Sequence, residues 1–259
     1  MKPLDAIAPG LVGLAVLGLW EALVRHFAVP PYVLPGPLAI WRALLEDWPL
    51  LAASLLVTLR IALLALLLAV ALGGLLAVAF AQSRWVERAF FPYAVVLQVT
   101  PVVAIAPLIL IWVDDVTIAL LICAWIVAFF PVLSNTVLGL NSADRTHLEL
   151  FRLYGATRWQ TLWLLRLPGA LPFFLAGLRV AGGLALIGAV VAEFVAGAGG
   201  TGSGLAFRIL EAGYQLKIPR MFAALALISV AGIGIFAVLG LLQHLLLRRW
   251  HESALRPEH

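Results

Sequence analysis

The 259-residue chain is 64% hydrophobic and only 12% charged, a balance at which a water-soluble domain could not cover its surface with polar groups. This composition indicates a protein whose main solvent is lipid. The formal net charge of +4 does not favour a nucleic-acid partner, because the basic residues are spread over short loops rather than gathered on one face.

Six apolar segments are long enough to cross a bilayer as helices. A hydrocarbon core of about 30 Å needs roughly 20 apolar residues in a helix, and continuously apolar runs disfavour a β-barrel, whose strands alternate. The fold class predicted is therefore all-α, a polytopic membrane protein with about six transmembrane helices. In chain order, we predict spans at about 7–24, 61–83, 89–113, 116–143, 168–196 and 221–243.

The segment between the first two spans, about 26–50, is rich in proline and tryptophan. Its prolines forbid one long helix, while Trp41 and Trp48 are side chains that anchor at the level of the lipid headgroups. A short amphipathic helix lying along the membrane surface is predicted from about Pro37 to Asp47.

Lysine and arginine residues are distributed unevenly between the two sides of the membrane. With six spans both termini share a side, and that side carries ten Lys and Arg residues against five on the other. Because positively charged loops stay in the cytoplasm, the richer side is predicted to be cytoplasmic. Both termini and the largest loop, about 142–167, are therefore expected on the cytoplasmic side.

Prolines interrupt the third predicted span at Pro92, Pro101 and Pro107. The polar residues Gln98 and Thr100 lie beside the middle proline, where a backbone carbonyl loses its helical partner. A broken helix is tolerated within a membrane when it faces protein or a water-filled cavity. Two interpretations stay open for Gln98, Thr100 and Pro101, namely a wall of a translocation path and helix packing.

Polar residues in the fourth and fifth spans are further candidates for such a path. Asn135 lies in the fourth span, and Glu193 lies deep in the fifth, where an ionisable group usually faces a cavity or pairs with a partner. Arg179 precedes Glu193 by 14 residues, which is about 21 Å of helix, so the two cannot pair. We expect Arg179 to reach the cytoplasmic interface or to bond to the loop.

The loop 142–167 reads SADRTHLELFRLYGATRWQTLWLLRL and is too apolar for a free linker. Apolar and charged residues mix on either side of Gly155, as two short amphipathic helices that meet at a glycine require. Apolar faces on the cytoplasmic side need a partner that covers them. We therefore predict a helix–glycine–helix surface for protein contact, and we call this segment the coupling loop.

Within the coupling loop, Glu149 lies six residues before Gly155, and Leu165, Leu167 and Pro168 close the pattern. This arrangement resembles the signature of binding-protein-dependent ABC importer permeases, with leucine and phenylalanine where two alanines are usual. The flanking sequences FPVLSNTVLGL and PGALPFFLAGLRVAGGLALIGAVVAEF resemble the nitrate, sulfonate, taurine and bicarbonate branch, to which permeases for thiamine-precursor pyrimidines and riboflavin are similar. The resemblance covers nearly the whole chain.

The resemblance implies a type I ABC importer permease of the bacterial inner membrane, with residues 1–259 as a single permease domain. It implies two copies of a separate ATPase that binds ATP and Mg²⁺, a second permease copy, and a periplasmic or lipid-anchored solute-binding protein. The chain itself would hold no cofactor or metal and would catalyse no reaction. By resemblance, the stretch AGYQLKIPRMFAAL favours pyrimidine-like solutes over sulfonates, nitrate or taurine. The residues that the resemblance assigns to ATPase coupling are Glu149, Arg152, Tyr154, Gly155, Ala156, Arg158, Trp159, Leu167 and Pro168.

Two other classes of membrane protein are weighed against this interpretation. A secondary transporter would also be a helical bundle with buried charges, but the sequence has no evident inverted repeat and carries the apolar cytoplasmic loop. An intramembrane protease would need a nucleophile beside a base, and Ser203 and His244 map to opposite sides of the membrane. The glycine-rich run 197–204 lacks the Gly-Lys-Ser or Gly-Lys-Thr of an ATP site, and no HExxH metal motif occurs.

Overall fold

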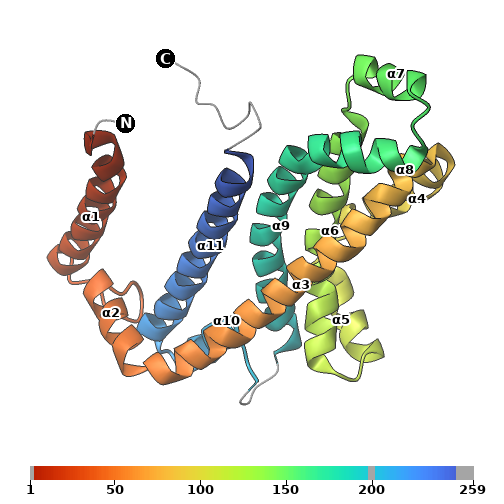
Figure 1. Cartoon of the computed structure of the whole chain (residues 1–259). Helices are drawn as coiled ribbons and strands as arrows, with labels where there is room; N and C mark the ends of the chain where they lie inside the picture. Colours follow the sequence, from red (N-terminus) through yellow and green to blue (C-terminus); the bar gives the residue numbers. More distant parts are fainter. Residues whose placement is uncertain (1–2, 198–201, 249–259) are drawn as a thin grey trace. The chain divides into compact units, whose positions relative to one another are not determined.

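The computed structural model describes residues 3–197 and 202–248, and the regular elements in this part of the chain are all helices, without strands (Figure 1). The terminal residues that the charge distribution assigns to the cytoplasm, 1–2 and 249–259, lie outside the described residues. The elements in chain order are α1 (Pro3–His26), α2 (Pro37–Glu46), α3 (Trp48–Gln82), α4 (Arg84–Val99), α5 (Val102–Trp112), α6 (Val116–Asn141), α7 (Arg145–Leu153), α8 (Arg158–Thr161), the π-helix η1 (Leu162–Arg166), α9 (Leu167–Ala196), α10 (Leu205–Tyr214) and α11 (Ile218–Leu247).

The predicted membrane spans are all helical. Among the described residues, four helices are long and apolar enough to cross a membrane, namely α3, α6, the continuous helix Arg158–Ala196 and α11. The pair α4 and α5 together forms a fifth candidate, and the 24-residue helix α1 coincides with the first predicted span. The short surface helix predicted after the first span is α2.

The third predicted span is broken rather than straight. Helices α4 and α5 meet at an angle of 99°. Pro101 has no backbone N–H and disfavours a helical conformation in Thr100, whose φ of −71° and ψ of 121° are extended. The Thr100 N–H and hydroxyl both donate to the Val96 carbonyl, at 3.1 and 2.7 Å. At 16 and 11 residues, neither helix alone reaches the roughly 20 residues that a span needs.

The chain divides into two compact units. The first unit comprises Met1–Val57 and Gly197–Val230, and the second comprises Thr58–Ala196 and Ala231–His259.

Polar contacts connect separate segments within the first unit. The Arg220 guanidinium donates two hydrogen bonds to the Asp47 carboxylate, of 2.5 and 2.6 Å, and Arg208 donates to the Ser54 hydroxyl at 3.0 Å. These contacts join the region around the α2–α3 junction to α10 and α11. The apolar core beside them consists of Leu51, Leu205, Ala223, Ala224 and Leu227.

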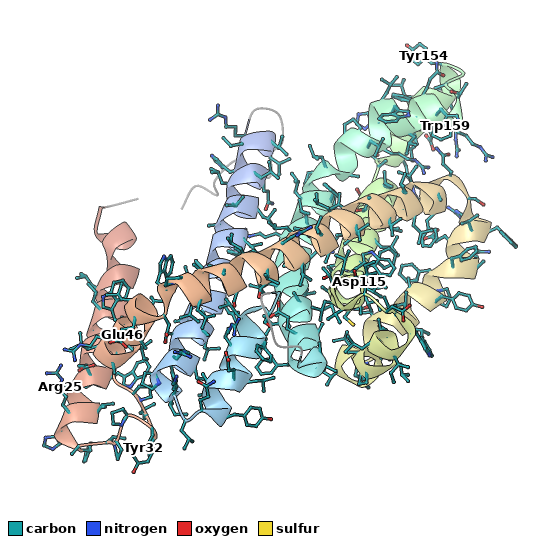
Figure 2. The ribbon with its side chains drawn as sticks, turned by 90° about the horizontal axis from the view of Figure 1, so that it is seen from below. Arg25, Tyr32, Glu46, Asp115, Tyr154 and Trp159 are labelled. Atoms are coloured by element: carbon teal, nitrogen blue, oxygen red, sulfur yellow. The ribbon has the colours of Figure 1, made fainter. Side chains whose placement is uncertain are left out.

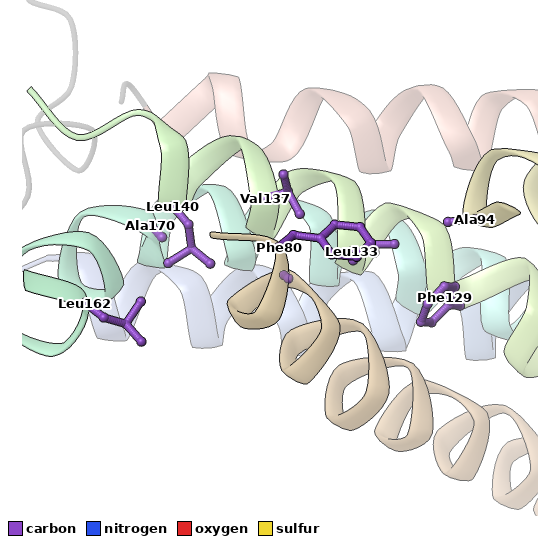
Figure 3. Close-up of a cluster of buried hydrophobic side chains, with 9 residues drawn as sticks. Phe80, Ala94, Phe129, Leu133, Val137, Leu140, Leu162 and Ala170 are labelled. Atoms are coloured by element: carbon purple, nitrogen blue, oxygen red, sulfur yellow. The ribbon is translucent and has the colours of Figure 1, made fainter. Parts of the chain in front are cut away.

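The second unit is built around the packing of α6 against α9. A cluster of buried apolar side chains from α3, α4, α6, η1 and α9 fills its interior (Figure 3). The cluster lies where the cytoplasmic loop predicted from the sequence joins the spans, because Leu162 and Ala170 belong to it. Its members are Ala77, Phe80, Ala94, Phe129, Leu133, Val137, Leu140, Leu162 and Ala170.

Three glycines allow α6 and α9 to approach closely. A Cβ added at Gly177 would lie 2.6 Å from the Pro131 carbonyl oxygen and 2.7 Å from Asn135 Cβ. Added Cβ atoms at Gly139 and Gly188 would likewise come within 2.9 Å of backbone atoms of the facing helix. In a membrane, van der Waals packing at small residues drives helix association because lipid supplies no hydrophobic driving force. The α6–α9 contact therefore depends on the absence of these side chains.

We predict that Gly177→Ala destabilises the protein by about 1–3 kcal/mol, because the new methyl group would overlap backbone atoms of α6. The measurement is the thermal unfolding midpoint of the purified chain in detergent. Gly183→Ala is the matched control, since a Cβ there meets no atom within 4 Å. The packing argument fails if both variants unfold at the same temperature.

Candidate functional site

The coupling loop forms two short helices separated by a left-handed glycine. Helix α7 ends at Leu153, and Gly155 follows with φ of +68°. The Gly155 N–H donates to the Arg152 carbonyl at 3.0 Å, and the Ala156 N–H donates to the Phe151 carbonyl at 2.9 Å. This pair of bonds is a Schellman motif, in which a residue without a Cβ adopts the left-handed conformation at little cost. The predicted helix–glycine–helix arrangement is confirmed.

Side-chain caps fix the start of each short helix. The Asp144 carboxylate accepts a hydrogen bond from the Thr146 N–H at 2.8 Å at the start of α7, and this bond lowers the pKa of Asp144. At α8, the Thr157 hydroxyl accepts from the Gln160 N–H at 3.2 Å, while the Gln160 side chain accepts from the Thr157 N–H at 2.8 Å. This capping box was not predicted, although its Thr-x-x-Gln pattern is readable in the sequence.

The tip of the coupling loop exposes large apolar side chains. Leu153 is 84% exposed, Tyr154 83% and Trp159 61%, and Figure 2 shows Tyr154 and Trp159 at the α7–α8 end of the second unit. Aromatic residues are enriched where proteins bind each other, because they supply contact area at a small entropic cost. The remaining predicted coupling residues divide by burial: Glu149, Arg152 and Arg158 are exposed, whereas Ala156, Leu167 and Pro168 are half-buried.

The coupling loop continues without a break into a membrane-spanning helix. Helices α8, η1 and α9 form one helical run from Arg158 to Ala196, which is 39 residues long. The Arg166 guanidinium in η1 donates to the Ala81 carbonyl at the end of α3, at 3.0 Å. Single-turn π-helices are rare and often occur at functional sites. A force on the exposed tip would therefore act directly on α9 and on the end of α3.

The residues predicted for a translocation path lie in different environments. Gln98 and Pro101 are exposed at the break between α4 and α5, where Thr100 is half-buried. Asn135 donates from its side-chain nitrogen to the Pro131 carbonyl at 2.9 Å, and it lies at the close contact between α6 and α9. Glu193 on α9 is only 3% exposed. Their role in solute transfer stays a prediction, and the contacts of Asn135 fit helix packing.

Arg179 has a different partner from the one expected. We expected it to reach the cytoplasmic interface or the loop, but its guanidinium carbon lies 3.7 Å from the centroid of the Phe236 ring on α11. A Cβ added at Gly240 would lie 3.4 Å from the guanidinium, an ordinary van der Waals contact, so Gly240 on α11 lies beside the arginine. A cation over an aromatic face is stabilised by the ring quadrupole, most strongly where water is excluded.

Several features considered for catalysis remain without support from the geometry. Within the described ranges, no group of three or more His, Cys, Asp or Glu side chains could hold a metal ion. Ser203 is buried in the first unit, and His244 is exposed on α11. Part of the glycine-rich run, residues 198–201, lies outside the described residues.

The apolar helices define a polytopic membrane protein, and its coupling loop exposes an aromatic tip. Comparison with known families identifies the class further. The family described as the binding-protein-dependent transport system inner membrane component matches residues 69–252, and the chain belongs to this family.

Curated relatives agree with this assignment. The formylaminopyrimidine transport permease protein ThiX of Halalkalibacterium halodurans is 35% identical, over 94% of this chain and 96% of that protein. The riboflavin transport system permease protein RibX of Chloroflexus aurantiacus is 35% identical, over 92% and 88%. The taurine transport system permease protein TauC of Escherichia coli is 30% identical, over 83% and 79%.

The solved structure of an amino acid ABC transporter with histidines shares the fold. Its chain superposes with a TM-score of 0.64 at 20% identity, over 77% of this chain and 95% of that one. The resemblance to the nitrate, sulfonate and taurine branch and the type I importer fold are thereby confirmed. The family assignment favours a permease subunit over the two alternatives weighed from the sequence, a secondary transporter and an intramembrane protease.

We predict that Gly155→Val weakens the α7–α8 turn by about 1–2 kcal/mol, because a β-branched residue is strained at positive φ. Gly155→Asn is the matched control, since asparagine tolerates this conformation. Hydrogen–deuterium exchange of residues 145–161 in detergent measures the change. Faster exchange is expected in the valine variant alone, and equal protection in both variants would contradict the role given to the glycine.

Proposed function

We propose that this permease subunit forms half of the pore of an ATP-driven importer, and that the coupling loop transmits movements of a separate ATPase to the spans. The observation that carries the proposal is the unbroken helical run from the exposed tip at Trp159 to the buried part of α9. A rigid helix transmits displacement, whereas a flexible linker would absorb it.

The coupling loop carries the chemistry that a partner surface needs. Tyr154 and Trp159 supply apolar contact area, while Glu149, Arg152 and Arg158 can select the partner by charge. Gly155 sets the angle between α7 and α8. The half-buried residues Ala156, Leu167 and Pro168 join the exposed tip to α9. Closure of the ATPase around ATP and Mg²⁺ would tilt the helices as rigid bodies and alternate access to a central path.

The proposed assembly contains two copies of this chain, two ATPase subunits and a periplasmic or lipid-anchored solute-binding protein. Two permease copies related by a two-fold axis give each ATPase an equivalent coupling loop. The chain acts as a single non-catalytic permease domain over residues 1–259, in the bacterial inner membrane with both termini in the cytoplasm. The excess of basic residues on the coupling-loop side supports this orientation.

For the solute, we propose a small nitrogen heterocycle of the pyrimidine type. The support is the 35% identity to permeases named for formylaminopyrimidine and for riboflavin, compared with 30% for the taurine permease. The solute path is proposed to be lined by polar residues and by the proline at the helix break: Gln98, Thr100, Pro101, Asn135 and Glu193.

The double variant Tyr154→Ala/Trp159→Ala is predicted to reduce solute-stimulated ATP hydrolysis at least about tenfold, since truncating aromatic anchors costs about 2 kcal/mol or more each. The measurement uses proteoliposomes that contain the permease, its ATPase and its solute-binding protein. Tyr214→Ala is the control, because Tyr214 is 87% exposed in the other unit. Unchanged hydrolysis in the double variant would overturn the proposed coupling surface.

The solute assignment predicts that an unlabelled aminopyrimidine competes with uptake by the complete importer, whereas taurine and nitrate do not. The same proteoliposomes measure uptake with ATP present inside. Competition by taurine alone would exclude the heterocycle and leave the coupling mechanism intact. Uptake by the permease without its ATPase would contradict the proposal that transport is driven by ATP.

A further inference from the structure

A basic cavity lies in the second unit between the α3–α4 junction and the coupling loop. Its volume is about 660 Å³, and four arginines line it: Arg84, Arg152, Arg158 and Arg166. None of the described residues that line it is acidic. The volume falls in the range of roughly 300–1,000 Å³ that small-molecule sites occupy.

The four arginines of the cavity form no ion pair within the described part of the chain, although Arg84 also lines a neighbouring cavity together with Glu87. The arginines that do form ion pairs in the described residues lie elsewhere in the chain: Arg25, Arg208 and Arg220. Arg166 donates to the Ala81 carbonyl, which is a neutral acceptor and leaves the guanidinium charge uncompensated. Four converging cations repel each other unless an anion lies between them.

Other groups of the same cavity also favour an anion. The side-chain nitrogen of Gln82, which lines the cavity, is fully buried and has no hydrogen-bond partner among the described residues. Ser83 caps the 16-residue helix α4, which begins at Arg84. A helix N-terminus attracts negative charge through its free N–H groups and its dipole. The buried amide, the arginines and the helix dipole therefore all favour an anionic ligand.

The position of the cavity favours a phosphate. The apolar helix α3 ends at Gln82, so the cavity lies where a span leaves the hydrocarbon and meets the lipid headgroups. In the proposed orientation this is the cytoplasmic leaflet, where basic pockets bind anionic headgroups. Guanidinium groups match phosphate geometry because each can donate two parallel hydrogen bonds.

We propose that this cavity binds a phosphate group, either the headgroup phosphate of an anionic phospholipid or a free phosphate anion. The bound phosphate bridges Arg84 on α4 and Arg152 and Arg158 of the coupling loop. It thereby ties the loop to the end of α3 and α4 and offsets the repulsion between their charges. The loop that contacts the ATPase is held in place by a ligand from the membrane surface or the cytoplasm.

The test uses the purified full chain in phosphatidylcholine nanodiscs, without the ATPase, so that its outcome is independent of the coupling proposal. In one arm phosphatidylglycerol replaces part of the lipid, and bound phosphatidylglycerol is counted by native mass spectrometry. In the other arm inorganic phosphate is titrated at constant ionic strength, and the thermal unfolding midpoint is followed. Specific binding in the first arm identifies the lipid as the source, and binding in the second identifies the free anion.

Arg84→Gln is expected to weaken binding about tenfold, which is the loss of one charge-assisted hydrogen-bonding group. Arg88→Gln is the matched control, because Arg88 is one turn along α4 and is not among the residues that line this cavity; it lines a neighbouring cavity, to which Arg84 and Glu87 also contribute. Arg84→Lys retains the charge and should keep part of the affinity. The proposal is overturned if neither ligand binds, or if Arg84→Gln and Arg88→Gln weaken binding equally. If the cavity instead binds carboxylates of the ATPase, neither phosphatidylglycerol nor inorganic phosphate will bind.

Discussion

The close contact between α6 and α9 is the constraint on which the second unit depends. At Gly177 the two helices approach until a single methyl group would overlap the Pro131 carbonyl, and Gly139 and Gly188 repeat the pattern along the same interface. Inside a membrane this packing replaces the hydrophobic effect as the source of association. It fixes α9, and α9 in turn carries the coupling loop. Whatever moves the loop must therefore move α6 and α9 together.

Hydrogen bonds hold the coupling loop at each joint that the structure describes. A left-handed glycine sets the turn, Asp144 and Thr157 cap the helices on either side of it, and the Arg166 contact anchors the base to α3. In the proposed mechanism these contacts matter because a flexible loop would deform and would not pass the displacement on to the helices. In the proposed mechanism, the exposed aromatic tip recognises the partner and the buried base transmits its movement.

The sequence predicts the helices well, because runs of apolar residues in lipid have one way to satisfy their backbone hydrogen bonds. It also predicts the turn at Gly155, where a glycine separates two amphipathic patterns. Pro101 predicts a break in the third span, but not its 99° angle, which depends on the packing of α4 and α5 against other helices. Arg179 shows the same limit: spacing along α9 excludes Glu193 as its partner and says nothing about which side chain of α11 covers it.

The stacking of Arg179 on Phe236 restricts how the helices can move in a transport cycle. If α9 tilted alone, the ring would withdraw from the guanidinium, and a cation–π contact worth about 2 kcal/mol where water is excluded would be lost. That penalty is comparable to the energy that separates two states of many switching proteins. The C-terminal half of α11 is therefore expected to follow α9, and with it α6, so that the three helices move as one group.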